Sequence, residues 1–326
     1  MGSLTRHAKV KVFNAEDAEK RKGRKDTKMA SSSKHVRRPT LACEIAADRV
    51  LAGRAADAGR MVEMAAAREL APGTVVPDLM EPNLRDGAAI RKAIQGALES
   101  VGGRSRDVIA ILPDTAVRVV LLDFETLPSK REEAEAVVRF RLKKSLPFDP
   151  AEARVSYHSQ TAGKGIRAVA AVVLNTVLEE YESAFRDAGY NPGMVMPSML
   201  AAIGAADAER PTLVVKVDAR TISIAILDQE QLLLARTLEN VRGVTITGDQ
   251  LAEEVYPSVV FFQDTYNLNI ERVYVAGLPE AGSAAPALKN QSGAVVEELV
   301  ASTQIGASTG TVPRWRMAGV VGALIS

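Results

Sequence analysis

Few side chains in this sequence have the type and spacing needed for chemistry of their own. His158 is the only histidine beyond residue 38, and Cys43 is the only cysteine. A catalytic histidine needs a nucleophile or acid beside it, and His158 lies in a predicted strand, so we expect a structural role for it. Cys43 lies in an apolar run, which favours a small core residue over a reactive thiol. No spacing of His, Cys and acidic residues typical of a metal site occurs.

Sequences that bind phosphate through a glycine-rich loop and a lysine are also absent. Gly163-Lys164-Gly165 has the residue types, but it lies between two predicted strands and is typical of a hairpin turn. The composition, 47% hydrophobic and 25% charged, is that of a globular protein. The sequence therefore predicts a globular chain in which no local motif identifies an enzyme.

Charge is distributed unevenly along the chain. Residues 1–38 carry 12 Lys+Arg and 4 Asp+Glu, which leaves 29 bases and 36 acids for residues 39–326. We expect residues 1–38 to be a disordered basic tail, and Met29 is an alternative start; the other interpretation is an arm that binds anionic lipid or nucleic acid. The mildly acidic remainder argues against a nucleic-acid partner for the folded part.

Two features of the sequence bear on the compartment. A membrane span requires a run of about 18 apolar residues, and no such run occurs. The basic N-terminus also lacks the apolar stretch of a signal peptide. A single cysteine allows no intramolecular disulfide and fits a reducing compartment. We therefore expect a cytoplasmic protein.

A strand meander followed by a helix is predicted at the start of the folded part. The strands are expected at 40–46, 49–56 and 61–68, joined by tight turns. The helix spans about 86–101, because its apolar residues recur at helical spacing. A buried strand follows at 108–112.

A small unit comes next, at residues 113–175. Its strands are expected at 117–124, 153–160 and 166–174. Between the first two lies a charged helix, which should begin with a capping box formed by Ser129 and Glu132 and end at Leu146-Pro147-Phe148. Acidic residues cluster at the N-terminal end of this helix and basic residues at its C-terminal end, as the helix dipole favours. Strand, helix, strand, strand is the size of a small inserted domain.

A second meander and helix follow. A connecting helix is expected after Asn175, with a capping box from Thr176 to Glu179. Strands are predicted at 213–217, 221–227 and 232–237, then a helix at 249–266 with a bend at Pro257, and a strand at 273–276. Residues 282–313 show no clear pattern, and 317–325 is expected to be a core helix.

The repeated meander-plus-helix unit resembles the actin-like ATPase fold. Further features in order are the hairpin Leu41–Ala55, the strand ending Ile111-Leu112-Pro113, the helix closing on Leu146-Pro147-Phe148, the strand Val169–Val173 before a helix ending Asp187-Ala188-Gly189-Tyr190, Arg236 in the second meander, and the terminal Ala318–Leu324. Their order resembles the PilM family of type IV pilus assembly, over about residues 39–326. The resemblance implies an α/β fold of two duplicated domains with a small inserted module.

The domain limits follow from this resemblance. The first actin-like domain comprises residues 39–112, 176–209 and 314–326. Residues 113–175 form the inserted module, and residues 210–313 form the second actin-like domain.

The resemblance also implies an ATP site between the two domains. In that fold an acidic residue in each hairpin orients the metal or the attacking water, and a glycine lets backbone N–H groups approach phosphate. Here the first hairpin reads Glu44-Ile45-Ala46, and the second reads Asp218-Ala219-Arg220-Thr221, so both lack the glycine. The turn that contacts adenosine reads Ala276-Gly277-Leu278-Pro279 instead of consecutive glycines.

The candidate nucleotide contacts are therefore Glu44, Ala46, Asp218, Thr221 and Gly277. The alternative interpretation is that they form ordinary turns. Because a methyl group is costly where φ must be positive or phosphate must come close, we expect at most weak binding of ATP with Mg²⁺ and no efficient hydrolysis. We assign no catalytic residue and no metal ligand, and the chain is not expected to be an enzyme.

The resemblance also implies a partner. Proteins of the PilM family bind the short cytoplasmic N-terminal tail of PilN, a single-span inner-membrane protein, in a groove between the first domain and the module. Phe140 lies off the main apolar stripe of its helix, and Arg139 and Arg141 flank it, so these three are the candidate groove residues. The alternative is that Phe140 covers an edge of the core while the arginines are solvated. A pilus ATPase and a second copy of the chain are further expected partners, and peripheral association with the inner membrane would follow through such partners.

Three function classes fit this resemblance. We favour a scaffold of pilus or related secretion assembly. An FtsA-like, nucleotide-dependent filament protein would need a membrane-binding amphipathic helix, and Ala318–Ser326 has no basic face to serve as one. A kinase of the same superfamily would need intact phosphate loops, which the sequence lacks.

Overall fold

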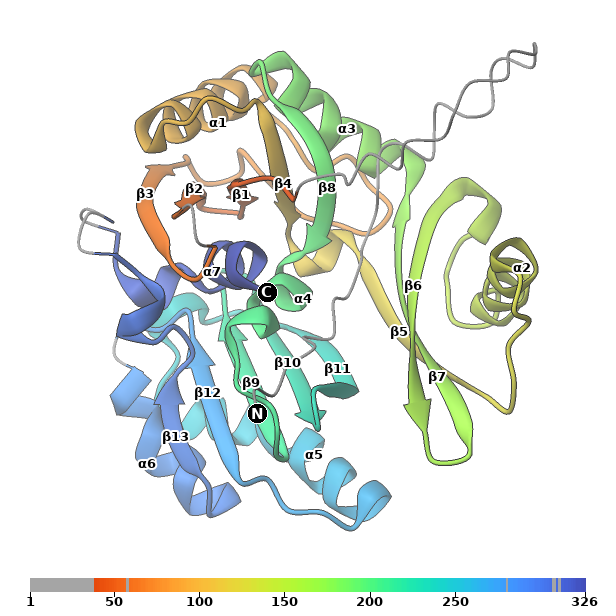
Figure 1. Ribbon diagram of the computed structural model, residues 1–326. Helices are drawn as coiled ribbons and strands as arrows, with labels where there is room; N and C mark the ends of the chain where they lie inside the picture. Colours follow the sequence, from red (N-terminus) through yellow and green to blue (C-terminus); the bar gives the residue numbers. More distant parts are fainter. Residues whose placement is uncertain (1–37, 57–58, 280, 307–308, 310–311) are drawn as a thin grey trace, which may run out of the picture.

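In a computed structural model the chain forms two large α/β units and a smaller one that projects from them (Figure 1), and residues 38–326 are described except 57–58, 280, 307–308 and 310–311. The first large unit is a five-stranded sheet of order β3-β2-β1-β4-β8. Its strands are β1 (Leu41–Ile45), β2 (Arg49–Ala55), β3 (Val62–Glu69), β4 (Asp107–Leu112) and β8 (Asn191–Pro197). Helices α1 (Gly87–Val101) and α3 (Asn175–Asp187) cover one face of this sheet.

The second large unit repeats this plan. Its sheet has the order β11-β10-β9-β12-β13, so an antiparallel meander is again extended by two parallel strands. Its strands are β9 (Thr212–Val217), β10 (Thr221–Asp228), β11 (Gln231–Glu239), β12 (Arg272–Ala276) and β13 (Val295–Glu298). Helices α5 (Gly248–Tyr266) and α6 (Ala281–Ser292) pack on one face of it. The two sheets therefore have the same strand order, as expected of a duplicated unit.

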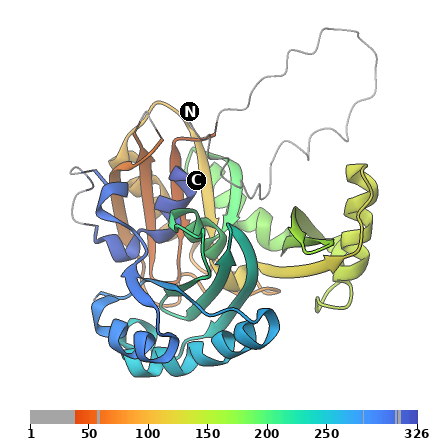
Figure 2. The same cartoon turned by 60° about the horizontal axis from the view of Figure 1, so that its bottom comes forward.

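The small unit lies between β4 and α3 in the chain and has its own core. Its strands β5 (Arg118–Phe124), β7 (Gly165–Leu174) and β6 (Ala153–Ala162) form a sheet of order β5-β7-β6, with α2 (Arg131–Leu142) on one face. Side chains alternate along a strand. In β7, Ala168, Ala170 and Val172 pack with α2, whereas Val169, Ala171 and Val173 pack with the core of the first large unit. The view from below shows α2 at the far end of the molecule (Figure 2).

Three predicted helix ends in this part of the chain are wrong. Helix α2 ends at Leu142 instead of Leu146, and the next three residues form a turn in which the N–H of Ser145 bonds to the oxygen of Leu142. The predicted capping boxes of α2 and α3 do not form either. Lys130 and Leu174 occupy the cap positions, because α2 starts later than expected and β7 runs directly into α3. A capping box does form at α5, between Thr247 and Gln250.

Several elements were not predicted. Strand β8 and the short helix α4 (Ser198–Ala202) follow α3, in a segment whose Pro192, Gly193 and Pro197 read as turn residues. Proline is tolerated in β8 because it is an edge strand, with a free side that needs no N–H donor. Helix α6 and β13 lie in the region that showed no clear pattern, and α5 continues as one helix through Pro257.

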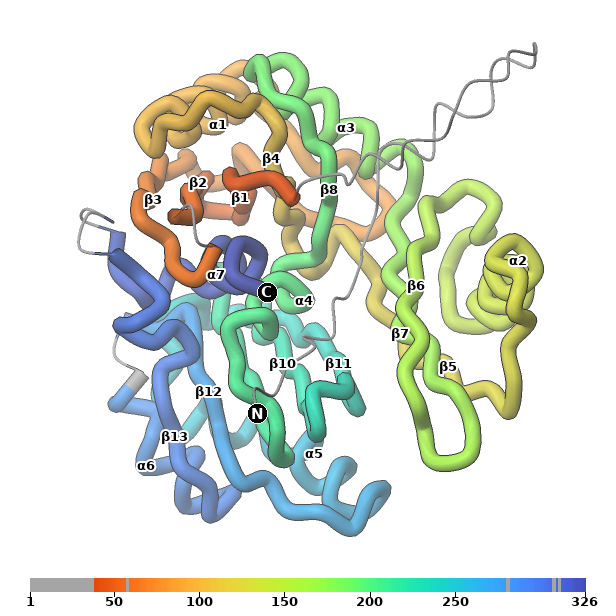
Figure 3. Tube along the Cα trace, in the orientation of Figure 1, coloured from red at the N-terminus to blue at the C-terminus, as the bar shows by residue number. Residues whose placement is uncertain are grey.

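The C-terminal helix α7 (Ala318–Ile325) lies at the centre of the molecule, against α4 and between the two sheets (Figure 3). Backbone touches backbone at this crossing. A Cβ atom added to Gly322 would lie 2.1 Å from the carbonyl oxygen of Ala201, and one added to Gly204 would lie 2.5 Å from that of Gly322. Glycine is therefore required here for close packing.

Substituting Gly322→Ala should lower the free energy of unfolding by about 2–4 kcal/mol, because the new methyl group overlaps backbone that cannot move independently. Denaturant unfolding followed by circular dichroism measures this. The control is Gly282→Ala in α6, where no atom lies within 4 Å of the added Cβ. This control should be neutral or slightly stabilising, and equal effects of the two changes would contradict the packing argument.

Candidate functional site

The two hairpins that open the meanders face each other where the large units meet. In each, a four-residue turn joins the strands: Ala46 N–H bonds to the oxygen of Arg49, and Asp218 N–H bonds to that of Thr221, both at 2.8 Å. Strand pairing resumes at Ile45 with Val50 and at Val217 with Ile222. Ala46 and Asp218 are therefore equivalent positions of the two units.

This register corrects the sequence comparison of the two hairpins. The prediction paired Glu44 with Asp218 as the two acidic residues. By register, Glu44 is the next-to-last residue of β1 and its equivalent in β9 is Lys216. The second hairpin thus presents a cation where the first presents an acid.

Lys216 joins the two units through buried ion pairs. Its Nζ atom lies 3.4 Å from Oε1 of Glu44 and also bonds to Asp218. The side chains of Lys216 and Glu44 are 3% and 2% exposed, so water does not screen this pair. Because Glu44 belongs to the first unit and Lys216 to the second, the ion pair spans the interface between them.

A second ion pair crosses the same interface, with its cation in the first unit and its acid in the second. Arg49 begins β2, and its Nη2 atom lies 3.4 Å from Oδ1 of Asp218, while Nη1 bonds to both oxygens of Asp48 at 2.8 and 3.0 Å. The arginine side chain is 3% exposed. The two cations, Lys216 and Arg49, therefore lie among three acids, Glu44, Asp48 and Asp218, between the two hairpins.

Uncharged donors add further hydrogen bonds to the acids of this network. Ser198, at the start of α4, donates to Glu44. Asp114 follows β4, and it accepts a bond from the N–H of Met199 and another from the hydroxyl of Ser223 in β10, both 2.7 Å long. Asp114 is thus a third link between the first unit and the second.

The environment shifts the pKa values of these groups in different directions. Burial alone would raise the pKa of Asp218, but Lys216 and Arg49 outweigh it and the pKa is lowered. Burial alone would lower the pKa of Lys216, but Asp218 and Glu44 outweigh it and the pKa is raised. For Asp114 burial dominates over its hydrogen bonds and Lys216, and raises its pKa to about 6. The Lys216–Asp218 pair therefore stays ionised at neutral pH, whereas ionising Asp114 is costly.

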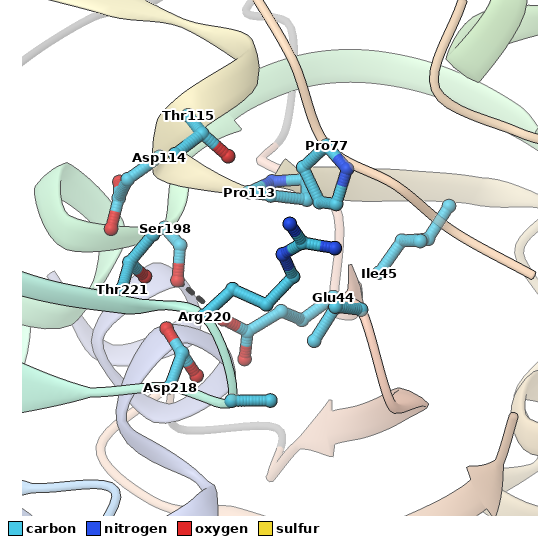
Figure 4. A pocket seen from close by; sticks show the side chains of 13 residues that line it. Glu44, Ile45, Pro77, Pro113, Asp114, Thr115, Ser198, Asp218, Arg220 and Thr221 are labelled. Atoms are coloured by element: carbon cyan, nitrogen blue, oxygen red, sulfur yellow. Dashed lines mark hydrogen bonds between the residues drawn. The ribbon is translucent and has the colours of Figure 1, made fainter. Parts of the chain in front are cut away.

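Little space remains between the hairpins. The cavity there has a volume of about 20 Å³ and is lined by the two turns, Asp114, Thr115 and Ser198, which is room for about one water molecule. The Arg220 side chain extends across this space toward Pro77 and Pro113 (Figure 4). As it stands, this space is far smaller than a nucleotide, and Lys216 places a positive charge between Glu44 and Asp218.

The structure brings together four of the five predicted nucleotide contacts. Glu44, Ala46, Asp218 and Thr221 all line this cavity. Gly277 is not part of its lining. It has φ +85°, its N–H bonds to the oxygen of Trp315 at 2.8 Å, and an added Cβ would lie 1.7 Å from the oxygen of Val217. Close packing against the end of β9 is sufficient to explain this glycine.

The three predicted groove residues lie on the outer side of the module, so their predicted position beside the first large unit is wrong. They belong to α2, which the module's sheet separates from that unit. Arg139 bonds to Glu135 and to the oxygen of Pro150, and Arg141 lies over the ring of Phe124. Phe140 is 70% exposed, so the alternative that it covers an edge of the core is also wrong.

Sequence reasoning missed Lys216, Arg49, Asp114 and Ser223. A signal for Lys216 was present, because a lysine inside the apolar run 213–217 must be either exposed or paired. Cys43 is buried, as expected, and burial raises the pKa of its thiol. Among the described residues no group of three or more metal-binding side chains occurs, and none of their helices is long and apolar enough to span a membrane.

Comparison with known proteins identifies the fold. No protein-family model matches the sequence, and no curated protein is significantly similar to it. Among solved structures, the chain resembles a PilM–PilN type IV pilus biogenesis complex, with a TM-score of 0.72 and 18% identity over 88% of this chain and 97% of that one.

Two further structures are similar to a lesser degree. One is the cytoplasmic domain of EpsL, an inner-membrane component of the type II secretion system of Vibrio cholerae, with a TM-score of 0.51 and 11% identity over 88% of this chain and 94% of that one. The other is a protein of unknown function with an actin-like ATPase fold from Bacteroides thetaiotaomicron VPI-5482, with a TM-score of 0.51 and 11% identity over 86% and 94%. The predicted actin-like fold is confirmed.

Substituting Lys216→Met should lower the free energy of unfolding by about 3–5 kcal/mol, because Glu44 is left buried without its cation. Chemical unfolding measures the loss. Lys92→Met, at an exposed position of α1, is the matched control and should change stability by less than about 0.5 kcal/mol. The double variant Glu44→Gln with Lys216→Met should lose less than the sum of the single changes; full additivity would show that the two groups do not interact.

The raised pKa of Asp114 predicts a pH dependence. Its folded-state pKa of about 6 lies above the usual 3.8, so the folded state binds this proton more tightly, and the group costs stability increasingly as pH rises from about 4 to above 6. Asp114→Asn keeps both hydrogen bonds possible and removes the charge. Its stability relative to the parent should rise by up to about 2–3 kcal/mol between pH 4 and pH 8.

Urea unfolding at both pH values measures this difference. Asp264→Asn, at an exposed position of α5, controls for loss of a carboxylate. A relative stability of Asp114→Asn that stays constant or falls between the two pH values would contradict the assignment.

Proposed function

We propose that this chain is a scaffold of type IV pilus or related secretion assembly, which binds the cytoplasmic N-terminal tail of a single-span inner-membrane protein of the PilN type. The observation that carries the proposal is the similarity to the PilM–PilN complex over nearly the whole length of both chains. The likeness to the cytoplasmic domain of EpsL from a second secretion system supports the same class of role. Association with the membrane would then come through the partner.

The proposal includes a nucleotide site that no longer works as one. In place of phosphate and metal, the hairpins hold Lys216 between Glu44 and Asp218, and Arg49 against Asp218. A divalent cation would be repelled by Lys216, and a nucleotide would have to open a cavity of about 20 Å³. We therefore propose that the protein is not an enzyme and that its large units are held together without ATP.

The tail would bind on the module side of the first unit. Among the described residues, strand β6 is the end strand of its sheet and pairs with β7 alone. The C-terminal end of β6 already contacts the second unit, because the side-chain amide of Gln160 bonds to both the N–H and the oxygen of Leu232 in β11. Between Ala153, whose oxygen accepts a bond from Arg139, and Gln160, β6 pairs with no second strand of the described chain, and we propose that this edge pairs with an extended peptide. This placement replaces the candidate groove on α2.

The two rival functions gain less support. A kinase needs phosphate-binding loops, and the geometry of both hairpins opposes that role. An FtsA-like filament protein needs a membrane-binding amphipathic helix, and α7, the segment considered for that role, is buried between the two sheets, with Ala318–Leu324 all buried. A scaffold needs neither feature.

Binding of the tail should be independent of nucleotide. In calorimetry with a synthetic peptide of the PilN-type tail from the same genome, the protein should bind the peptide with the same affinity with and without Mg-ATP. Hydrogen exchange should then slow at the outward amides of Ala153–Ser159 in β6, while amides of β9 and β10 should be unchanged.

Two results would count against these claims separately. Absence of binding under both conditions would remove the pilus assignment. Binding that protects other amides but not those of β6 would leave the assignment intact and place the tail elsewhere.

A further inference from the structure

Helix α2 has an outward face that no other described element covers (Figures 1 and 2). Its buried residues Ala134, Val138 and Leu142 pack on the module's sheet. Ala136 and Phe140 lie on the opposite side and are both exposed. They are four residues apart and so form one apolar patch on the helix surface.

Charged residues flank this patch in a symmetrical way. Glu132 and Glu133 precede it, and Lys143 and Lys144 follow it in the turn after α2, all exposed. Glu133 pairs with Lys130 at the surface, where such a pair contributes little. Glu132, Lys143 and Lys144 form no ion pair within the described part of the chain. Along the sequence, position 138 is the midpoint between Glu132 and Lys144 and also between Glu133 and Lys143.

We propose that this face binds a second copy of itself, with the two α2 helices antiparallel. A two-fold axis beside position 138 places Phe140 of each copy on Ala136 of the other. The same rotation places the two glutamates of each copy opposite the two lysines of the other. This contact covers Phe140 of both copies and forms four complementary charge contacts, as an isologous dimer requires.

Other occupants satisfy fewer of these groups. A parallel second copy would place acid against acid and base against base. An anionic membrane would attract the lysines but repel the glutamates, and the four charges of this face sum to zero. Only a partner with the reverse charge order fits, and the antiparallel helix of the same chain has that order.

The contact is small. A helix of 12 residues covers less than the roughly 1,000 Å² of a stable interface, so the dimer should be weak in dilute solution and form where the chain is concentrated. Sedimentation velocity over a concentration series to several hundred micromolar is therefore the suitable measurement. The full chain should show reversible dimerisation, and Phe140→Ala should weaken it about tenfold.

Charge reversal gives the decisive test. The double variants Glu132→Lys/Glu133→Lys and Lys143→Glu/Lys144→Glu should each fail to dimerise, because each places like charges opposite one another. Mixed in equal amounts they should form a heterodimer, since an all-basic face then meets an all-acidic one. Circular dichroism of each variant checks that it is folded, as expected for exposed positions.

A disulfide test fixes the register. Cys43 is buried, so Ala136→Cys and Phe140→Cys proteins can be mixed under oxidising conditions. The mixed disulfide should exceed either homodimeric one.

Three results would overturn the proposal. These are no association of the parent chain at these concentrations, no rescue on mixing the charge variants, or binding to anionic vesicles that is lost only in Lys143→Glu/Lys144→Glu and not rescued by mixing. The last would show that this face binds a membrane instead.

Discussion

The buried ion pair between Lys216 and Glu44 is the interaction on which the arrangement of the two large units depends. Where the hairpins at the ends of β1 and β9 meet, Lys216 pairs with Asp218 and Arg49 pairs with Asp48 inside their own units. Glu44, in contrast, has its ion-pair partner in the second unit. Glu44 needs a cation from the second unit, and Asp218 receives Arg49 from the first. Buried ion pairs add little net stability compared with apolar packing, but removing one partner is costly, so the network specifies how the units join.

This network also explains why the loops look unlike nucleotide loops. Lys216 and Arg49 offset the charges of Glu44 and Asp218 between the hairpins. Ala46 and Ala219 line the cavity there. Selection for phosphate binding would favour glycine and an uncompensated site. Selection for a fixed interface accepts alanine and a buried ion pair. The geometry is therefore compatible with the scaffold role that we propose, in which the small module would bind partners.

Most of the fold could be predicted from the sequence, because the two meanders, α1, α5 and the module follow clear strand and helix periodicities. Prediction failed where local residues suggest a turn but tertiary contacts decide otherwise, as in β8 with Pro192 and Pro197. The site was predicted less well. Glu44, Ala46, Asp218 and Thr221, predicted as nucleotide contacts, do line one cavity. Lys216 and Arg49 were missed, because pairing across the interface depends on the strand register. The position of Phe140 failed for the related reason that only the packed sheet shows which side of α2 faces the body.

The central claim is that contacts within the chain, and not a nucleotide, hold the two large units together. Titration of the purified chain with Mg-ATP in a calorimeter, with thermal unfolding of the same samples, tests it most directly. The account predicts no saturable heat at millimolar Mg-ATP and an unchanged unfolding temperature. Tight binding with a rise in unfolding temperature, which a ligand at 100 times its dissociation constant would produce through about 2.7 kcal/mol of added stability, would contradict it.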